Sequence, residues 1–288
     1  MYVAHTANDA VDVVDCTTNR YLRSIPGLLR VAGALVSEAD DLVFTSNRGE
    51  NTVGIFSPAC EEAVARVKVG IEPNGLAYDA DRGLLLAANV GDPSRPGSFT
   101  VSLVDVRSRT LVADVPVPGR TRWAIVDRAS GRFYVNIAHP ARLAVVDGAD
   151  PSRPAACFPV PAMGPHGLDF DPATQRLFCA CDAEVLGVLD ATSGTVASQH
   201  ALSGAPDVVF FNPTLRHLYV AIGDPGVIDV FDTETMRHLE RFPTEAGAHT
   251  IGFDADRNIV YAFLPGTHRA AICRDSAPPR SVGGSARS

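Results

Sequence analysis

Five polar residues of different chemistry occupy one position of a repeated sequence frame. Each stands five residues before a polar residue that ends a short apolar run, and together they are Asn74, Arg122, His166, Asp207 and His249. In one further copy of the frame the same position holds Ala32. A requirement shared by all copies would select similar residues. We therefore interpret the set as a site to which each repeat contributes one group, with decoration of a wet channel as the alternative.

The groups in this set suit anion binding and acid–base chemistry. Arg122 can hold a carboxylate or a phosphate through two parallel hydrogen bonds. Neutral His166 and His249 are suited to act as general base and general acid near pH 7, and Asp207 can orient one imidazole. If the site belongs to an enzyme, we predict that these four residues are catalytic.

Further residues are expected around the same site. Arg30, Glu72 and Arg120 stand two residues before the position described above. Trp123, the only tryptophan, would provide an apolar wall, although alternation along a strand also makes it an inward core residue. The predicted ligand-binding residues are Arg30, Glu72, Asn74, Arg120, Trp123, His5, His139 and His268.

A metal ion is a second chemistry that the residue types allow. His5, His166, Asp207 and His249 are of the types that bind zinc and related metals. They come from distant parts of the sequence, however, and no short-range metal motif supports such a site. The chain also has no P-loop, no dinucleotide fingerprint, no H-E-x-x-H and no G-x-S-x-G. We predict neither a metal nor a cofactor.

The frame that positions these residues recurs about every 42 residues. The polar residues that end its first apolar run are Ser37, Asp79, Asp127, Asp171, Asn212 and Asp254, at intervals of 42, 48, 44, 41 and 42 residues. Between them lie four short apolar runs with period-two alternation, separated by turn sequences such as DPATQ and DTETM. Four short strands in a unit of about 40–45 residues are typical of a β-propeller blade.

We predict an all-β fold, a seven-bladed β-propeller of four-stranded antiparallel blades, with strands labelled a to d from the axis outward. Strand a of the first blade and strand d of the last are missing from this chain. The propeller domain is predicted to cover residues 1–274, with blades near 1–27, 28–70, 71–118, 119–160, 161–202, 203–244 and 245–274, before a disordered tail at 275–288. Because an open ring exposes sheet edges, we expect the stated start to lie inside the first blade, with about 25 upstream residues supplying the missing strands.

This topology places the candidate residues together. In an antiparallel meander the start of strand a, the end of b and the start of c lie at one face of the disc, and strand a is innermost. Residues just before strand a are therefore expected to surround the mouth of the central channel. Five of the eight histidines map to this face, namely His5, His139, His166, His249 and His268.

Several segments resemble a known repeat family. The pieces MYVAH, VFTSN and LLAAN, followed by NTVGIFS or AVDVVDCTTN, are similar to the YVTN repeat of YncE-like seven-bladed propellers, and PHGLDFDPATQRLF is similar to that family's strand-a signature. The resemblance extends to about Cys273 and departs where Ile137, Cys181 and Ile222 replace the motif asparagine. It implies the fold. It does not imply one activity, because the family includes binding and scaffold proteins and lies close to propeller lactonases.

Composition argues against several classes of partner. The net charge is −8, Lys68 is the only lysine, and no basic run is present, so a nucleic-acid partner is not expected. No apolar run approaches the roughly 20 residues that span a bilayer, so a membrane partner is not expected either. The opening MYVAHTAND lacks the features of a signal peptide, and six cysteines without an export signal indicate reduced thiols in the cytoplasm. This cytoplasmic location would change if a missing N-terminal segment carried an export signal.

Two classes of function remain open. The first is a YncE-like propeller that binds a small, anionic ligand or a protein partner at the channel mouth. The second is a propeller enzyme of lactonase or cycloisomerase type, in which the arginine and histidine residues support lactone opening or proton transfer on an anionic substrate. Turnover of lactone and carboxylate substrates, and its loss when His166 and His249 become alanine, would distinguish them.

Overall fold

The short alternating runs of the sequence form β-strands that tight turns join into seven antiparallel sheets. The structure is a computed structural model, and it describes residues 1–151 and 155–276. The first sheet contains β1 (Tyr2–His5), β2 (Ala10–Asp15) and β3 (Arg20–Pro26), with a short 3-10 helix, η1 (Thr6–Asn8), after β1. The second contains β4 (Val31–Ser37), β5 (Leu42–Asn47), β6 (Thr52–Ser57) and β7 (Cys60–Lys68). The third contains β8 (Pro73–Asp79), β9 (Leu84–Asn89), β10 (Thr100–Asp105) and β11 (Thr110–Pro116).

The remaining four sheets follow the same plan. The fourth contains β12 (Thr121–Asp127), β13 (Arg132–Ile137), β14 (Arg142–Asp147) and β15 (Ala156–Pro159). The fifth contains β16 (Pro165–Asp171), β17 (Arg176–Cys181), β18 (Val185–Asp190) and β19 (Val196–Ala201). The sixth contains β20 (Pro206–Asn212), β21 (His217–Ile222), β22 (Val227–Asp232) and β23 (Arg237–Pro243), and the seventh β24 (Ile251–Asp254), β25 (Ile259–Leu264) and β26 (Arg269–Arg274). Within residues 1–151 and 155–276, no helix has the length and apolar character needed to cross a bilayer.

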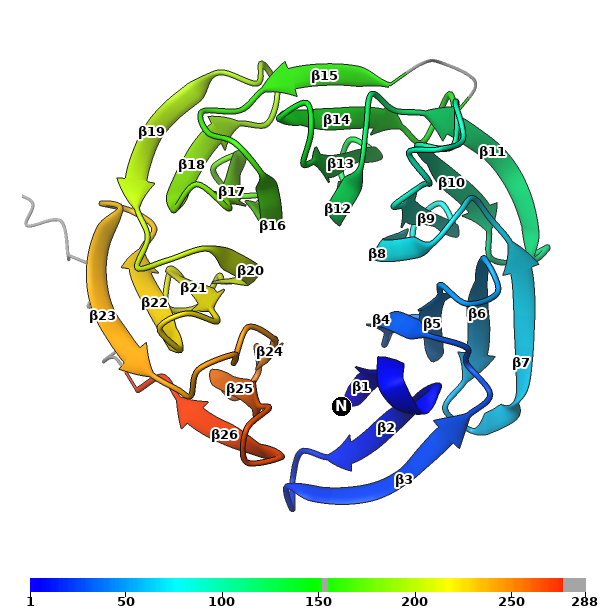
Figure 1. Ribbon diagram of the computed structural model, residues 1–288, viewed down its shortest axis with the longest axis horizontal. Coiled ribbons are helices and arrows are strands. Elements are labelled where there is room, and N and C mark those ends of the chain that lie inside the picture. The colour runs from blue at the N-terminus through cyan, green and yellow to red at the C-terminus, as the bar shows by residue number, and fades with distance from the viewer. Residues whose placement is uncertain (152–154, 277–288) are drawn as a thin grey trace, which may run out of the picture.

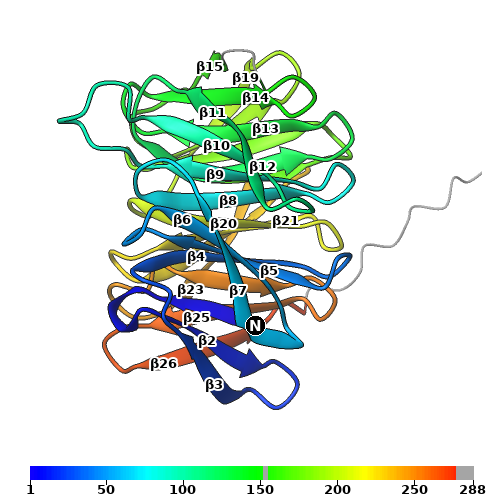
Figure 2. The same ribbon diagram turned by 90° about the vertical axis from the view of Figure 1, so that its right-hand side faces the viewer.

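The seven sheets form a ring, so the predicted fold, a seven-bladed β-propeller, is confirmed (Figure 1). In the four-stranded sheets the first strand lies innermost and the fourth lies at the outer edge. In the part of the chain that the structure describes, the first and last sheets have three strands each. This agrees with the prediction that the first blade lacks strand a and the last blade lacks strand d. Seen from its edge, the ring has strands that run from one face to the other (Figure 2).

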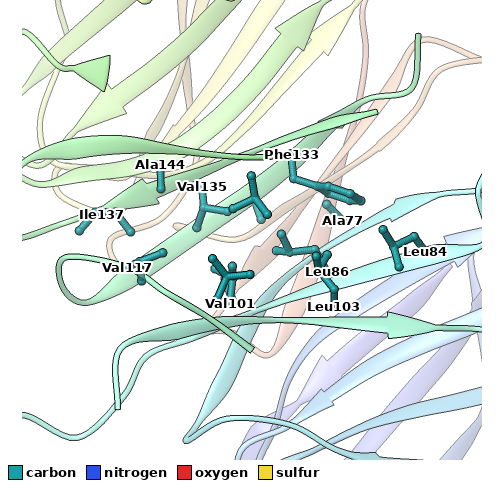
Figure 3. Close-up of a cluster of buried hydrophobic side chains, with 14 residues drawn as sticks. Ala77, Leu84, Leu86, Val101, Leu103, Val117, Phe133, Val135, Ile137 and Ala144 are labelled. Atoms are coloured by element: carbon teal, nitrogen blue, oxygen red, sulfur yellow. The ribbon is translucent and has the colours of Figure 1, made fainter. Parts of the chain in front are cut away.

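The core is divided among the spaces between neighbouring blades. The space between the third and fourth sheets is filled by apolar side chains from both, including Leu86, Val101, Phe133 and Val135, all fully buried (Figure 3). Because the middle strands are covered on both faces, their residues are buried on both sides, and all six residues of β9 are buried. This packing holds neighbouring blades together. The loops at the two faces of the ring can carry polar groups.

Turns on one face of the ring are closed by the polar residues that end the innermost strands. The buried Asp171 accepts a hydrogen bond from the backbone of Ala173 at 3.1 Å, and Asn212 accepts one from Thr214 at 3.0 Å. These are Asx turns, in which a short side chain replaces a backbone acceptor. The opposite face, where the innermost strands begin, is called the upper face below. Of the predicted tail, residues 277–288 lie outside the described residues, whereas Asp275 contacts His217 at 2.6 Å.

Candidate functional site

A β-bulge near the start of the innermost strand separates the candidate residues from the pairing of their own sheets. In the fifth sheet the pairing between β16 and β17 skips His166. Similar shifts skip Asp207 in the sixth sheet and Arg122 in the fourth. A bulge leaves its extra residue unpaired and re-aims its side chain. These three side chains are therefore displaced from the regular pleat at the upper face.

Glycines in or directly after these irregular stretches allow neighbouring innermost strands to approach closely. A Cβ atom at Gly167 would overlap the backbone oxygen of Asp207, and one at Gly75 would lie 2.5 Å from the backbone oxygen of Arg122. Real Cβ atoms do not make contacts this short, so only glycine fits without displacement of the next blade. The side chain of Asn136 adds hydrogen bonds of 3.0 Å to the backbone oxygens of His166 and Gly167. Side chains of successive blades are thereby brought within reach of one another.

Four side chains from the fifth, sixth and seventh blades form one continuous polar cluster, which we call the His–Asp group: His166, Asp182, Asp207 and His249. His249 Nδ1 lies 2.6 Å from Asp207 Oδ2, and His166 Nε2 lies 3.1 Å from Asp207 Oδ1. His166 Nδ1 lies 2.8 Å from Asp182 Oδ1. Asp207 therefore contacts both candidate histidines.

The protonation of His166 decides which partner its Nε2 atom binds. Arg122 Nη1 lies 3.3 Å from this atom, so a neutral ring protonated at Nδ1 donates to Asp182 and accepts from Arg122. A charged ring instead donates to both Asp182 and Asp207. Arg122 also lies 3.8 Å from Asp182. The contacts around His166 therefore suit both the neutral and the charged form of its ring.

The electrostatic environment favours charge on the Asp207–His249 pair. Burial alone would raise the pKa of Asp207, but hydrogen bonds with His166 and His249 lower it below its usual range. The hydrogen bond to Asp207 raises the pKa of His249, against the opposing effect of burial. The His249 side chain is 56% exposed, compared with 20% for His166. His249 is therefore the more accessible imidazole, and the Asp207 carboxylate holds its Nδ1 side.

Four arginines lie next to this cluster, and we call them the arginine group. Two come from the second blade, one from the loop between the third and fourth blades and one from the fourth blade: Arg30, Arg48, Arg120 and Arg122. Burial lowers the pKa of Arg48, with Glu72 opposing the effect and the other three arginines adding to it. Arg30 Nη1 lies 3.3 Å from Glu72 Oε1. In the described part of the chain, the Nε atoms of Arg48 and Arg122 are buried without a hydrogen-bond acceptor. Such a group of guanidinium ions is suited to hold an anion.

Two of these charged residues adopt a backbone conformation that favours glycine. Arg30 and Glu72 have φ values of 49° and 53°. In the fifth and seventh blades the same position is occupied by Gly164 and Gly247, with φ values of 71° and 86°. The left-handed region costs a non-glycine residue roughly 1–2 kcal/mol. The second and third blades therefore keep a charged side chain where the local backbone would favour glycine.

Three histidines predicted to bind ligand lie outside the His–Asp group. His5 ends β1, and its Nδ1 lies 2.9 Å from Asp12 Oδ2 in the same blade. His139 lines a separate cavity of about 380 Å³ on the upper face. His268 is exposed in the loop before β26. These residues share the predicted face but do not join the His–Asp group.

The other two predicted ligand-binding residues have different surroundings. Trp123 packs against the core between the fourth and fifth blades and against that between the sixth and seventh. Because these cores belong to separate parts of the ring, the half-buried indole extends toward the ring axis. Asn74 is half-buried, and its backbone oxygen accepts a hydrogen bond of 2.8 Å from Ser46.

The histidines and carboxylates are not grouped as metal ligands. Among the residues that the structure describes, no set of three or more His, Cys, Asp or Glu side chains is arranged to hold a metal ion. The His–Asp group is instead a chain of alternating imidazole and carboxylate groups, which is suited to hydrogen bonding and proton transfer. The absence of a cofactor remains a prediction from sequence.

Sequence reasoning missed Arg48 and Asp182. Both are the first residue after the second strand of their blade, following Asn47 and Cys181. The corresponding position in the other blades holds Thr6, Val90, Ala138, Gly223 and Pro265. This position lies one residue beyond the motif asparagine of the repeat, and in the second and fifth blades it places a charged residue at the upper face.

Comparison with known proteins identifies the fold. No family model matches the chain, and a search of curated proteins finds no relative. A protein of unknown function from Desulfotomaculum acetoxidans superposes with a TM-score of 0.80 at 12% identity, over 98% of this chain and 95% of that one. Hydrazine synthase from Kuenenia stuttgartiensis gives 0.81 at 13% identity, over 96% and 92%. The dihydro-heme d1 dehydrogenase NirN gives 0.70 at 20% identity, over 91% of this chain and 58% of that one. At these identities the similarity establishes the propeller fold alone.

Proposed function

We propose that this propeller binds a small anionic ligand at its upper face, where Arg122 joins the arginine group to the His–Asp group. The observation that carries the proposal is the gathering of guanidinium groups at one place: Arg30, Arg120 and Arg122 lie close enough to Arg48 for their charges to lower its pKa, and Arg122 also reaches the His–Asp group, with Nη1 3.3 Å from His166 Nε2. A carboxylate or a phosphate offsets this concentration of positive charge and accepts hydrogen bonds in the bidentate geometry that guanidinium favours.

The charge distribution supports a local site. The chain carries a net charge of −8, so its overall field does not attract anions. The arginine group places positive charges close together, and their mutual repulsion contributes to the lowered pKa of Arg48. A bound anion offsets that repulsion. Binding should therefore weaken as salt rises, because exposed members of the group are screened.

The resemblance to YVTN repeats agrees with this proposal. YncE-like propellers include proteins that bind ligands or partners without catalysis, and this chain has the same kind of seven-bladed ring. We propose that the chain is a binder of this kind, with a small molecule as the first candidate and a protein partner as the second. The activities named for hydrazine synthase and NirN belong to those proteins and carry no weight here.

Calorimetric titration with four simple anions tests the proposal. Acetate, succinate, citrate and inorganic phosphate are titrated into the protein at low ionic strength. We expect at least one to bind, and expect Arg48→Gln and Arg122→Gln each to weaken that binding by about 10- to 100-fold, the loss of a charge-assisted hydrogen bond. Arg237→Gln, an exposed arginine at the start of β23 on the opposite face, is the matched control. Absence of binding by all four anions, or equal binding by all variants, would refute the proposal.

A propeller enzyme of lactonase or cycloisomerase type is the second candidate. The observation that favours it is the contact of 2.6 Å between His249 Nδ1 and Asp207 Oδ2. A carboxylate that holds one side of an imidazole leaves the other nitrogen for proton transfer, here on the more exposed histidine. The arginine group would then hold the carboxylate that forms when a lactone opens.

Turnover assays separate the two candidates. γ-Butyrolactone, δ-valerolactone and a panel of carboxylates are offered to the parent protein and to His166→Ala and His249→Ala. An enzyme loses turnover in both variants while the circular dichroism spectrum is retained. His200→Ala, in the outer strand β19, is the control. Absence of turnover in the parent across the panel favours the binder.

A further inference from the structure

A cavity of about 380 Å³ opens on the upper face beside the fourth blade. One wall is the segment 139–142, which ends the loop between β13 and β14 and includes the first residue of β14, and the other is the segment 160–163, between β15 and β16. Six of its eight lining residues are apolar, and His139 and Arg142 are the other two. A cavity of this size accommodates a short alkyl chain or a single ring.

The loop that forms the first wall is hydrogen-bonded to the segment that carries Arg120 of the arginine group. The backbone N–H of Ala138 donates a hydrogen bond of 2.8 Å to the backbone oxygen of Arg120. One residue earlier in the chain, Gly119 packs so closely on the backbone oxygen of His139 that a Cβ atom would overlap it. The loop that carries His139 is therefore held against the strand start that carries Arg120 and Arg122.

The second wall continues into the His–Asp group. The backbone N–H of Ala183 donates to the backbone oxygen of Met163 at 3.2 Å, and that of Asp182 donates to Gly164 at 2.8 Å. Asp182 in turn contacts His166 at 2.8 Å. Met163, at the edge of the cavity, is thus three residues from His166 in the chain and is fastened to the loop that carries Asp182.

The cavity offers apolar surface that the fold does not cover completely. Val160 and Ala162, in the second wall, pack onto the core between the fourth and fifth blades. Met163 is 58% exposed, although burial of a methionine side chain is energetically favourable. An apolar group bound here would cover Met163, and the loop that forms each wall of the cavity is hydrogen-bonded to a segment that carries part of one of the two charged groups.

We infer that this cavity is a subsite for the apolar part of the anionic ligand, and that the ligand is a carboxylate bearing a short alkyl or aromatic substituent. The inference rests on the proposed function, because the carboxylate is held by the arginine group. It also gives His139 a place in binding that is separate from the His–Asp group. His139 and Arg142 border the substituent, and Met163 packs against it.

A series of carboxylates that differ only in their apolar part tests the inference. Acetate, hexanoate and phenylacetate are titrated calorimetrically into the parent protein, Met163→Ser, Met163→Leu and Ala141→Phe, with Arg237→Gln as control. Each methylene that becomes buried strengthens binding by about fourfold, so hexanoate and phenylacetate are expected to bind at least about tenfold more tightly than acetate. Met163→Ser and Ala141→Phe should bring that ratio toward one, by loss of apolar contact and by filling the cavity. Met163→Leu should retain it.

The outcomes separate this inference from the proposed function. If acetate binds and depends on Arg122, but hexanoate and phenylacetate bind no more tightly, the subsite is refuted and the anion site stands. If the preference for apolar carboxylates survives both Met163→Ser and Ala141→Phe, the apolar group binds elsewhere and the subsite is again refuted. If no carboxylate binds, or if neutral hexanamide binds as tightly as hexanoate, the proposed function fails and the subsite fails with it.

Discussion

The close contact between Gly167 and the next blade can be tested by adding one methyl group. In Gly167→Ala the new Cβ would overlap the backbone oxygen of Asp207 and lie 2.5 Å from Val209 Cγ2. A backbone oxygen cannot rotate out of the way, so β20 must move away from β16. The shift would also lengthen the 3.1 Å contact between His166 Nε2 and Asp207 Oδ1.

The expected loss of stability follows from two opposing effects. Overpacking of a well-packed site costs about 1–3 kcal/mol. Replacement of glycine by alanine reduces the freedom of the unfolded chain and returns about 0.4–1 kcal/mol. The net destabilisation should be about 1–2 kcal/mol, which lowers the Tm by about 2–4 °C for a protein of this size.

Thermal and urea unfolding, followed by circular dichroism, measure this loss. Gly252→Ala is the matched control, because Gly252 also lies in an innermost strand, β24, and its added Cβ would meet Met1 Sδ at an ordinary 3.5 Å. The control should be as stable as the parent protein, or more stable. If Gly167→Ala proves as stable as Gly252→Ala, the close approach of β16 and β20 is not what brings the His–Asp group together.

Three polar side chains should respond measurably to conservative substitution. Asp207→Asn should lower the pKa of His249, which the Asp207 hydrogen bond raises, and NMR titration of the imidazole follows the change. A raised histidine pKa stabilises the fold below the ordinary value near 6.5, and the gain is lost as pH rises through the folded pKa. The variant should therefore lose more stability at pH 6 than at pH 9, and equal losses would contradict this origin. Burial raises the pKa of Asp169 to about 7, so the folded state keeps a proton that the unfolded state releases near pH 4. Stability should fall between about pH 4 and 7 and then level off, and Asp169→Asn should remove that dependence in urea unfolding; the same pH profile in both proteins would count against it. Tyr134→Phe removes the 2.9 Å hydrogen bond to the backbone oxygen of Ala191 and should cost about 1 kcal/mol, whereas an unchanged unfolding midpoint would show that the bond contributes nothing.

The ring could be predicted because its information is local and repeated. Each blade is an antiparallel meander of short strands, and its turns need only an Asp or Asn at a fixed place, such as Asp171 or Asn212. Strands that follow one another in sequence pair with one another, so a regular period leaves little choice of topology. The same regularity predicted three-stranded first and last sheets.

The residues of the site could be predicted only in part. Aligning the repeats shows on which face of the ring a residue lies, but it does not show which side chains touch. Alignment of the repeats placed His5, His139 and His268 on the same face as His166, yet His5 contacts Asp12 of its own blade. Conversely, Arg48 and Asp182 belong to the clusters and were missed. Whether two side chains on one face touch depends on their rotamers and on the distance between blades. The repeat pattern of the sequence determines neither.

By itself the sequence determined that seven similar sheets form and that polar groups of different chemistry occupy one end of their innermost strands. Only the tertiary structure decided that His166, Asp207 and His249 touch, that Arg122 lies within reach of His166, and that Trp123 turns toward the cores. The physical reason is that strand pairing is set by short-range pattern, whereas these contacts need bulges that redirect side chains and a glycine, Gly167, that lets two blades approach. Such contacts exist only once the ring has formed.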